Sequence, residues 1–107
     1  MKYNKTGKSI NVETDAPKLL SATSADYDTI NVKWQEVKGA TGYKVYRKKA
    51  GEKDFTALGF VKGTTYKDDS AQVGQEYYYT VRAYVGETSK LGSFDKNGIK
   101  GVALPKK

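Results

Sequence analysis

Residues 74–86 read GQEYYYTVRAYVG, and the three adjacent tyrosines in this stretch constrain the fold more than any other feature. In a β-strand, successive side chains point to opposite faces of the sheet, so neighbouring tyrosines cannot share one environment. One face of this segment is apolar and is expected to point into a core; it carries Tyr77, Tyr79, Val81 and Ala83. The other face carries Tyr78, Thr80, Arg82 and Tyr84.

The same two-residue period recurs in residues 29–37 and 43–49. Alternation of this kind is typical of half-buried strands. The side chains expected to face the core are Ile30, Val32, Trp34, Tyr43 and Val45. On the second of these segments, Lys44 and Tyr46 point the other way.

Further short strands are expected after Pro17, over residues 55–61, around Tyr66 and near residues 99–104. The glycine in 55–61 predicts a bulge or an edge strand, and the last segment fits either register. Glycine-containing turns separate the segments, and no helical period is sustained. Short strands at this spacing predict an all-β fold, an immunoglobulin-like antiparallel β-sandwich of about seven strands.

The 107 residues correspond to one domain, which we place at residues 15–105 after a tail or linker at residues 1–14. Aliphatic residues are scarce, but nine tyrosines and one tryptophan supply core area in their place. Residues 1–10 lack the apolar segment of a signal peptide, so export would require a leader outside this sequence.

Three segments in order resemble a fibronectin type III domain, of the kind found as modules in exported proteins of Gram-positive bacteria. They read APKLLSAT, INVKWQEVKGATGYKVYRK and TTYKDDSAQVGQEYYYTVRAY, and the likeness extends over about residues 16–104. The resemblance implies that Tyr77 forms the tyrosine corner, its hydroxyl bonding back to the preceding loop. It also implies that Trp34 packs across the core from the opposite sheet. The structural residues expected from pattern and resemblance together are Trp34, Tyr43, Val45, Tyr77, Tyr79 and Val81.

The chain departs from the family in two places. The segment after the tyrosine-rich strand reads VGETSKLG and lacks the Arg-Gly-Asp motif of the family's integrin-binding version, so that kind of adhesion is not implied. The stretch before the last strand is longer than expected, and SFDKNG, residues 93–98, has no clear counterpart.

The residue types argue against catalysis. The chain has no histidine and no cysteine, which removes the commonest general base, the thiolate nucleophile and most transition-metal sites. Two carboxylate pairs, Asp26 with Asp28 and Asp68 with Asp69, fit Asx turns, with a calcium site as the alternative. Hydrolysis of glycosides by paired carboxylates would need a cleft that a small packed sandwich lacks. We therefore expect no enzyme activity, no metal and no cofactor.

The net charge of +7 is spread over scattered lysines, and only two of the 19 basic residues are arginine. Arginine is the usual bidentate reader of bases, so no nucleic-acid partner is expected. No stretch approaches the ~20 apolar residues of a membrane helix, so no membrane insertion is expected.

The outward face of the two best-defined strands gathers tyrosines and cations, and it is the candidate binding surface: Tyr46, Tyr78, Tyr84, Arg82 and Lys44. Cross-strand aromatic and cation–aromatic pairs alone can account for such a face. Exposed aromatic rings can also stack on sugars or anchor a protein partner. Both interpretations remain open from the sequence.

The sequence therefore predicts a non-catalytic spacer or interaction module of a larger exported or cell-surface bacterial protein. Its partners would be the neighbouring domains of the parent chain, with protein or polysaccharide at the cell surface as further candidates. The location expected is extracellular or cell-wall associated. The alternative function is a ligand-binding module, for carbohydrate or protein, that uses the tyrosine-rich face.

Overall fold

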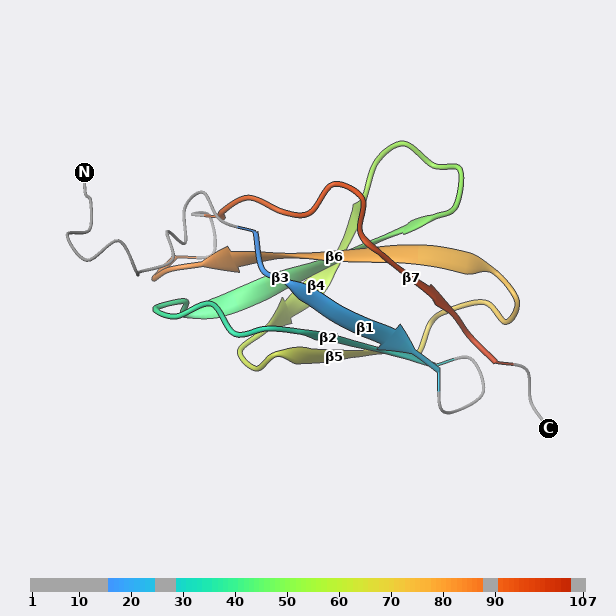
Figure 1. Ribbon diagram of the computed structural model, residues 1–107, viewed down its shortest axis with the longest axis horizontal. Helices are drawn as coiled ribbons and strands as arrows, with labels where there is room; N and C mark the ends of the chain where they lie inside the picture. Colours follow the sequence, from blue (N-terminus) through green and yellow to red (C-terminus); the bar gives the residue numbers. More distant parts are fainter. Residues whose placement is uncertain (1–15, 25–28, 88–90, 105–107) are drawn as a thin grey trace.

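The computed structural model describes residues 16–24, 29–87 and 91–104, and these ranges form two antiparallel sheets packed face to face (Figure 1). The strands are β1 (Leu19–Thr23), β2 (Ile30–Trp34), β3 (Gly42–Lys49), β4 (Thr56–Val61), β5 (Thr65–Asp68), β6 (Glu76–Tyr84) and β7 (Ile99–Val102). One sheet has the order β1-β2-β5 and the other β4-β3-β6-β7. The predicted all-β sandwich of seven strands is confirmed. The expected tail at residues 1–14 and the pair Asp26 and Asp28 lie outside the described residues.

The core lies between the sheets and is built by the residues that the two-residue period assigns to it. Trp34 of β2 packs edge-to-face on Tyr43 of β3, with ring centroids 5.5 Å apart. Val45, Tyr79 and Val81 are fully buried around them. Aromatic and β-branched side chains thus close the space between the sheets in a chain with few leucines and isoleucines.

Two core tyrosines place their hydroxyl groups on backbone amides of loops. The Tyr77 hydroxyl accepts a hydrogen bond from the Gln72 backbone N–H at 2.7 Å, which is the contact that a tyrosine corner makes. The Tyr43 hydroxyl accepts one from the Val37 N–H, also at 2.7 Å. Each bond satisfies a loop donor that the approach of the ring removes from water.

The β3–β4 pair contains a bulge at the glycine that the sequence singles out. Its register shifts between Val45 and Tyr46, opposite the stretch from Gly59 to Ala57. β4 is also an edge strand of its sheet. Gly59 therefore lies at a bulge and on an edge strand, the two features that the sequence predicts for it.

The register of β7, which the sequence leaves open, is decided by close packing at Gly101. Tyr77 pairs with Gly101 and Tyr79 with Ile99, so Ile99 and Gly101 point inward. A Cβ on Gly101 would lie 3.0 Å from the side chains of both Ala22 and Ile30. The other register would place Lys100 in this space, and burial of an unpaired ammonium group is costly.

A buried carboxylate links the two sheets. Asp68 of β5 is only 2% exposed, and its Oδ2 accepts hydrogen bonds from Arg47 Nη1 of β3 at 2.9 Å and from the Tyr79 hydroxyl of β6 at 2.5 Å. Its Oδ1 accepts from the backbone N–H and the hydroxyl of Ser70. The expected Asx turn is present at Asp68, and it forms one part of this larger polar cluster.

The cluster shifts the acid–base behaviour of its members. Burial raises the pKa of the Asp68 carboxyl, but hydrogen bonds from Tyr79, Ser70 and Arg47 outweigh burial and hold that pKa below its usual value. Burial and the neighbouring Asp68 carboxylate raise the pKa of the Tyr79 hydroxyl above its ordinary value. The folded state therefore favours an ionised Asp68 and a neutral Tyr79.

Candidate functional site

The outer face of the β3–β6 pair holds the predicted binding residues, but they do not form an open strip. Lys44, Tyr46, Tyr78 and Arg82 are each half-buried. The expectation that Tyr84 is exposed is wrong, because the residue is only 4% exposed.

Tyr84 is buried because its partner on β3 is a glycine. Gly42 pairs with Tyr84, and a Cβ built on Gly42 would lie 2.6 Å from the Tyr84 hydroxyl. The ring therefore lies down over the glycine backbone and contacts Phe60 edge-to-face at 5.8 Å. Alternation of side chains places Tyr84 on the outer face. Because Gly42 has no side chain, the Tyr84 ring can pack against the backbone there and become buried.

The long β6–β7 connection covers the middle of the same face. The Gly92 N–H donates to the Ala83 carbonyl at 2.8 Å, and the Gly92 carbonyl accepts from Arg82 Nε at 2.6 Å. The Thr80 hydroxyl donates to the Asp95 carbonyl at 2.8 Å, and Thr80 is fully buried. The SFDKNG segment without a family counterpart is thus part of a strap along β6.

Three aromatic rings meet where this connection approaches the β3–β4 turn. Phe94 of the connection stacks on Tyr46 of β3, with centroids 6.4 Å apart and ring planes 26° apart. Phe55, at the end of the turn, meets Phe94 edge-on at 5.9 Å. Phe94 therefore brings the β6–β7 connection into contact with the β3–β4 turn, although Phe55 and Phe94 are about 40 residues apart in the sequence.

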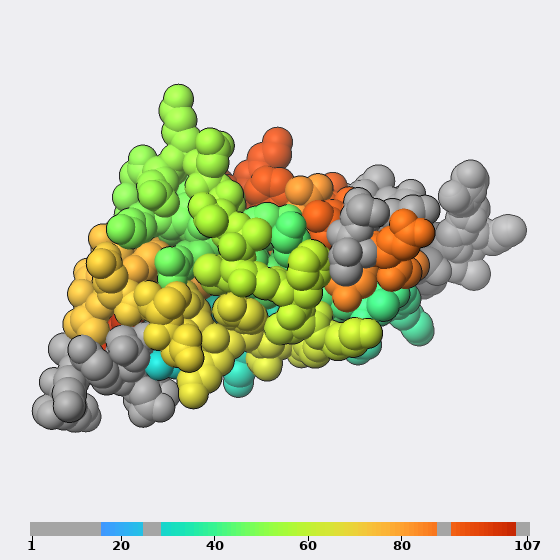
Figure 2. Space-filling view, turned by 180° about the vertical axis from the view of Figure 1, so that it is seen from behind, coloured from blue at the N-terminus to red at the C-terminus, as the bar shows by residue number. Residues whose placement is uncertain are grey.

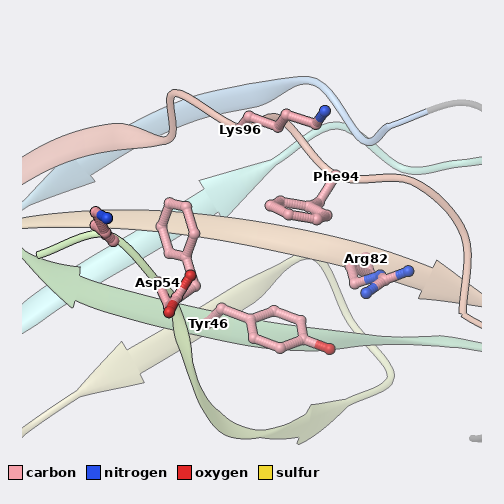
Figure 3. Close-up of a pocket in the computed structure, with 7 residues that line it drawn as sticks. Tyr46, Asp54, Arg82, Phe94 and Lys96 are labelled. Carbon is pink, nitrogen blue, oxygen red and sulfur yellow. The ribbon is translucent and has the colours of Figure 1, made fainter.

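A pocket of about 360 Å³ opens among these rings. Figure 2 shows the β3–β4 turn, in green, standing out from the body beside the red-orange β6–β7 connection. In Figure 3, Phe94 lies above Tyr46, with Arg82 toward one end of the pocket and Asp54 toward the other. The residues that line it are Tyr46, Lys53, Asp54, Phe55, Arg82, Phe94 and Lys96.

Cations outnumber carboxylates around the pocket. Its lining includes Lys53, Arg82 and Lys96 against the single carboxylate of Asp54. The Arg82 guanidinium lies 5.3 Å from the Phe94 ring centroid. Outside the lining, Lys48 Nζ lies 4.9 Å from the centroid of the Phe55 ring. The pocket lining therefore combines aromatic rings with an excess of positive charge.

The structure brings together two of the predicted binding residues, Tyr46 and Arg82, in the pocket lining. Lys44 lies beside them, its Nζ 5.5 Å from the Tyr46 ring and 5.1 Å from the Phe60 ring. Sequence reasoning missed the other lining residues, which come from a turn and a connection: Lys53, Asp54, Phe55, Phe94 and Lys96. The one available signal was the unmatched SFDKNG segment, which contains Phe94 and Lys96.

Within the described ranges, no three histidine, cysteine, aspartate or glutamate side chains gather as a metal-binding group. The described part of the chain likewise contains no helix long and apolar enough to cross a membrane.

Comparison with known proteins places this sandwich among its relatives. No protein-family model matches the chain. An Fn3-like protein from Clostridium thermocellum is 26% identical in sequence, superposes with a TM-score of 0.66, and the match covers 88% of this chain and 95% of that one. The fn3 domain of human collagen alpha-1(XX) superposes with a TM-score of 0.70 over 94% of this chain, at 18% identity.

The chain has the fibronectin type III fold.

Two further matches are parts of much longer proteins. An amylopullulanase from Thermoanaerobacterium saccharolyticum is 30% identical over 90 residues, which is 83% of this chain and 7% of the amylopullulanase. A β-1,2-glucanase from Parabacteroides distasonis superposes on this fibronectin type III fold with a TM-score of 0.71 at 21% identity, over 87% of this chain and 13% of that one. The chain thus spans a small fraction of the curated relative it matches.

Proposed function

We propose that this chain is a non-catalytic module of a larger exported or cell-surface bacterial protein of the glycoside hydrolase type, where it spaces and positions neighbouring domains. The observation that carries the proposal is the amylopullulanase match, in which most of this chain corresponds to a small fraction of a long protein. A fibronectin type III sandwich is a self-contained folded unit, so it can recur within such a chain.

The path of the chain through the sandwich supports a spacer role. β1 and β7 run in the same direction along the length of the molecule in Figure 1, so the described chain enters toward one end and leaves at the other. Domains joined before β1 and after β7 would be held apart by the rigid body of the sandwich. Its partners would be those neighbouring domains, with no nucleic acid and no membrane insertion, in an extracellular or cell-wall setting.

Two measurements test this role. The 107-residue chain, incubated with starch, pullulan and β-glucans, should release no reducing ends above buffer; activity abolished by substituting a residue of this chain would overturn the non-catalytic assignment. The chain should also be placed between two fluorescent proteins and compared with a Gly/Ser linker of equal length. A folded spacer gives a narrow distance distribution, whereas a flexible linker gives a broad one. Equally broad distributions would contradict the spacer role.

A second candidate function is ligand binding on the outer face of the β3–β6 pair. The observation that favours it is the pocket bounded by Tyr46, Phe55 and Phe94, because ligand sites are concave and largely apolar with a few polar groups. An amide-shift titration with soluble oligosaccharides distinguishes the two candidates. Shifts at the pocket favour a binding module, and their absence leaves these rings as packing between the strap and the sheet.

A further inference from the structure

We propose that the pocket between the β3–β4 turn and the β6–β7 connection binds an acidic sugar, a uronic acid unit of an anionic oligosaccharide. This inference rests on the second candidate function, ligand binding, and is independent of the spacer role. It names the chemical class of the ligand from the shape, the aromatic walls and the charge of the pocket.

The size and walls of the pocket suit a sugar ring. A volume of about 360 Å³ lies at the lower end of the range for small-ligand pockets. Aromatic rings offer broad apolar faces to the C–H groups of a pyranose ring, and they order few rotatable bonds in doing so. Tyr46 and Phe94 stack on each other, and both line the pocket with Phe55, so a sugar ring bound there can lie against this aromatic surface.

The charge of the lining selects an anion. Lys53, Arg82 and Lys96 give three positive charges against one negative charge on Asp54, a net charge of +2. Arg82 uses its Nε to bond the Gly92 carbonyl, and this fixes the plane of the guanidinium beside Phe94. A guanidinium held in place can direct its terminal N–H groups at a carboxylate in the paired geometry that arginine favours.

The two ends of the pocket suit different groups of a sugar acid, its carboxylate at one end and its hydroxyl groups at the other. The Tyr46 hydroxyl and the Arg82 guanidinium lie at the same end in Figure 3, where a sugar carboxylate can accept from both. Asp54 lies at the opposite end, and its carboxylate can accept hydrogen bonds from sugar hydroxyl groups. A neutral sugar could accept hydrogen bonds from the three cations, but only a sugar acid would also offset the net positive charge of the lining.

A peptide fits this place less well than a sugar. Extended peptides bind most often by adding a strand to a free sheet edge. The pocket instead lies over the face of the sheet, above β3 and β6, and each of these strands pairs with a neighbour on both sides. The backbone under the pocket therefore has no unpaired ladder to offer an acidic peptide.

The test is a titration of the ¹⁵N-labelled 107-residue chain with trigalacturonate, and with maltotriose as the neutral ligand of equal length, at physiological salt. We expect trigalacturonate to shift amides at residues 46, 53–55, 82 and 94–96 and to bind at least fivefold more tightly than maltotriose. Phe94→Leu should remove most of the binding. Lys53→Gln should weaken it about two- to fivefold, as expected for loss of one solvent-exposed charge pair.

Lys67→Gln is the matched control, since Lys67 is an exposed lysine on β5 in the other sheet and carries the same change of charge. It should leave trigalacturonate binding unchanged. Both lysine variants should keep the dispersed amide spectrum of the folded chain, and Lys53→Gln should have the same midpoint of urea unfolding as the original protein.

The remaining outcomes separate the ligand class from the function. Equal affinity for maltotriose, or full competition by inorganic phosphate or a polyglutamate peptide, would overturn the acidic-sugar class while leaving ligand binding at this face intact. Equal weakening by Lys53→Gln and Lys67→Gln would mean attraction to the overall charge and would overturn the site. No shifts at the pocket with either sugar would overturn the ligand-binding candidate itself.

Discussion

At the scale of single residues, tyrosine hydroxyl groups have different roles according to the face on which they lie. The hydroxyl of Tyr77 accepts from the Gln72 N–H, and that of Tyr79 donates to the buried Asp68 carboxylate. Between them in sequence, Tyr78 is half-buried on the outer face. The triple tyrosine therefore combines a loop anchor, a member of the polar cluster and a surface ring in three consecutive residues.

Replacing Tyr77 by phenylalanine should lower the free energy of unfolding by about 1–3 kcal/mol, because the Gln72 N–H then lacks its acceptor. Urea unfolding followed by fluorescence measures the change. Tyr78→Phe removes a hydroxyl from the neighbouring position and should change stability by less than about 0.5 kcal/mol. Equal losses in the two variants would contradict the assignment of Tyr77 as the anchor.

Asp68→Asn should destabilise the domain at pH 7 by about 3 kcal/mol, the lower part of the range for removing one member of a buried ion pair, since Arg47 keeps 22% of its side-chain surface exposed. The pKa of Asp68 is lowered on folding, so its carboxylate stabilises the native state above the unfolded pKa of about 4. That contribution is lost as the pH falls through the lower pKa of the folded state.

The difference in stability between the original protein and Asp68→Asn should therefore shrink when urea unfolding is repeated below pH 4. A difference that stays constant from pH 7 to about pH 2.5 would mean that ionisation of Asp68 does not stabilise the fold.

At the scale of elements, the β6–β7 connection decides what the outer face becomes. The connection enters β7 through Gly98, which has a φ of +71°. A Cβ on Gly98 would lie 3.0 Å from the backbone carbonyl oxygen of Tyr79. Phe55 and Tyr78 also lie near this position. Glycine is therefore required there both by the backbone angle and by the closeness of the strap to the sheet.

Gly98→Ala should lower the free energy of unfolding by about 2–3 kcal/mol. The alanine would be strained in the left-handed backbone conformation, and its Cβ would displace a neighbouring group. Gly86→Ala is its control, because Gly86 has a φ of +77° but nothing within 4 Å of an added Cβ. That variant should cost only about 1 kcal/mol. Thermal unfolding of both proteins measures the difference. Equal midpoints would indicate that the close contact between Gly98 and the Tyr79 carbonyl of β6 does not limit the residue at position 98.

At the scale of the whole molecule, the two sheets are joined by the Trp34–Tyr43 contact and by the Asp68 cluster. The single tryptophan lies in the three-stranded sheet but packs on the four-stranded one. A probe at this residue therefore senses the separation of the sheets.

Unfolding curves measured by tryptophan fluorescence and by far-ultraviolet circular dichroism should coincide within error, because neither sheet can keep its apolar face covered alone. The same coincidence is expected in Asp68→Asn at its lower midpoint. Curves that separate would show that one sheet persists after the other has opened.

Much of the fold could be read from the alternation of side chains, because burial on one face of a strand acts through neighbours two residues apart. Ile30, Val32 and Trp34, and likewise Tyr77, Tyr79 and Val81, are buried as that period predicts. The candidate site was only partly predictable. Tyr46 and Arg82 follow from strand parity, but the burial of Tyr84 depends on the absent side chain of Gly42, a partner 42 residues away across the sheet.

The sequence by itself determined the class of fold and the inward residues of its long strands, since these follow from local periodicity and turn residues. Only the tertiary structure decided the register of β7, the link from Arg47 to Asp68 and the pocket of Tyr46, Phe55 and Phe94. Each of these joins residues from distant segments. Their contacts depend on how two sheets and a long connection pack in space, and no local pattern encodes that packing.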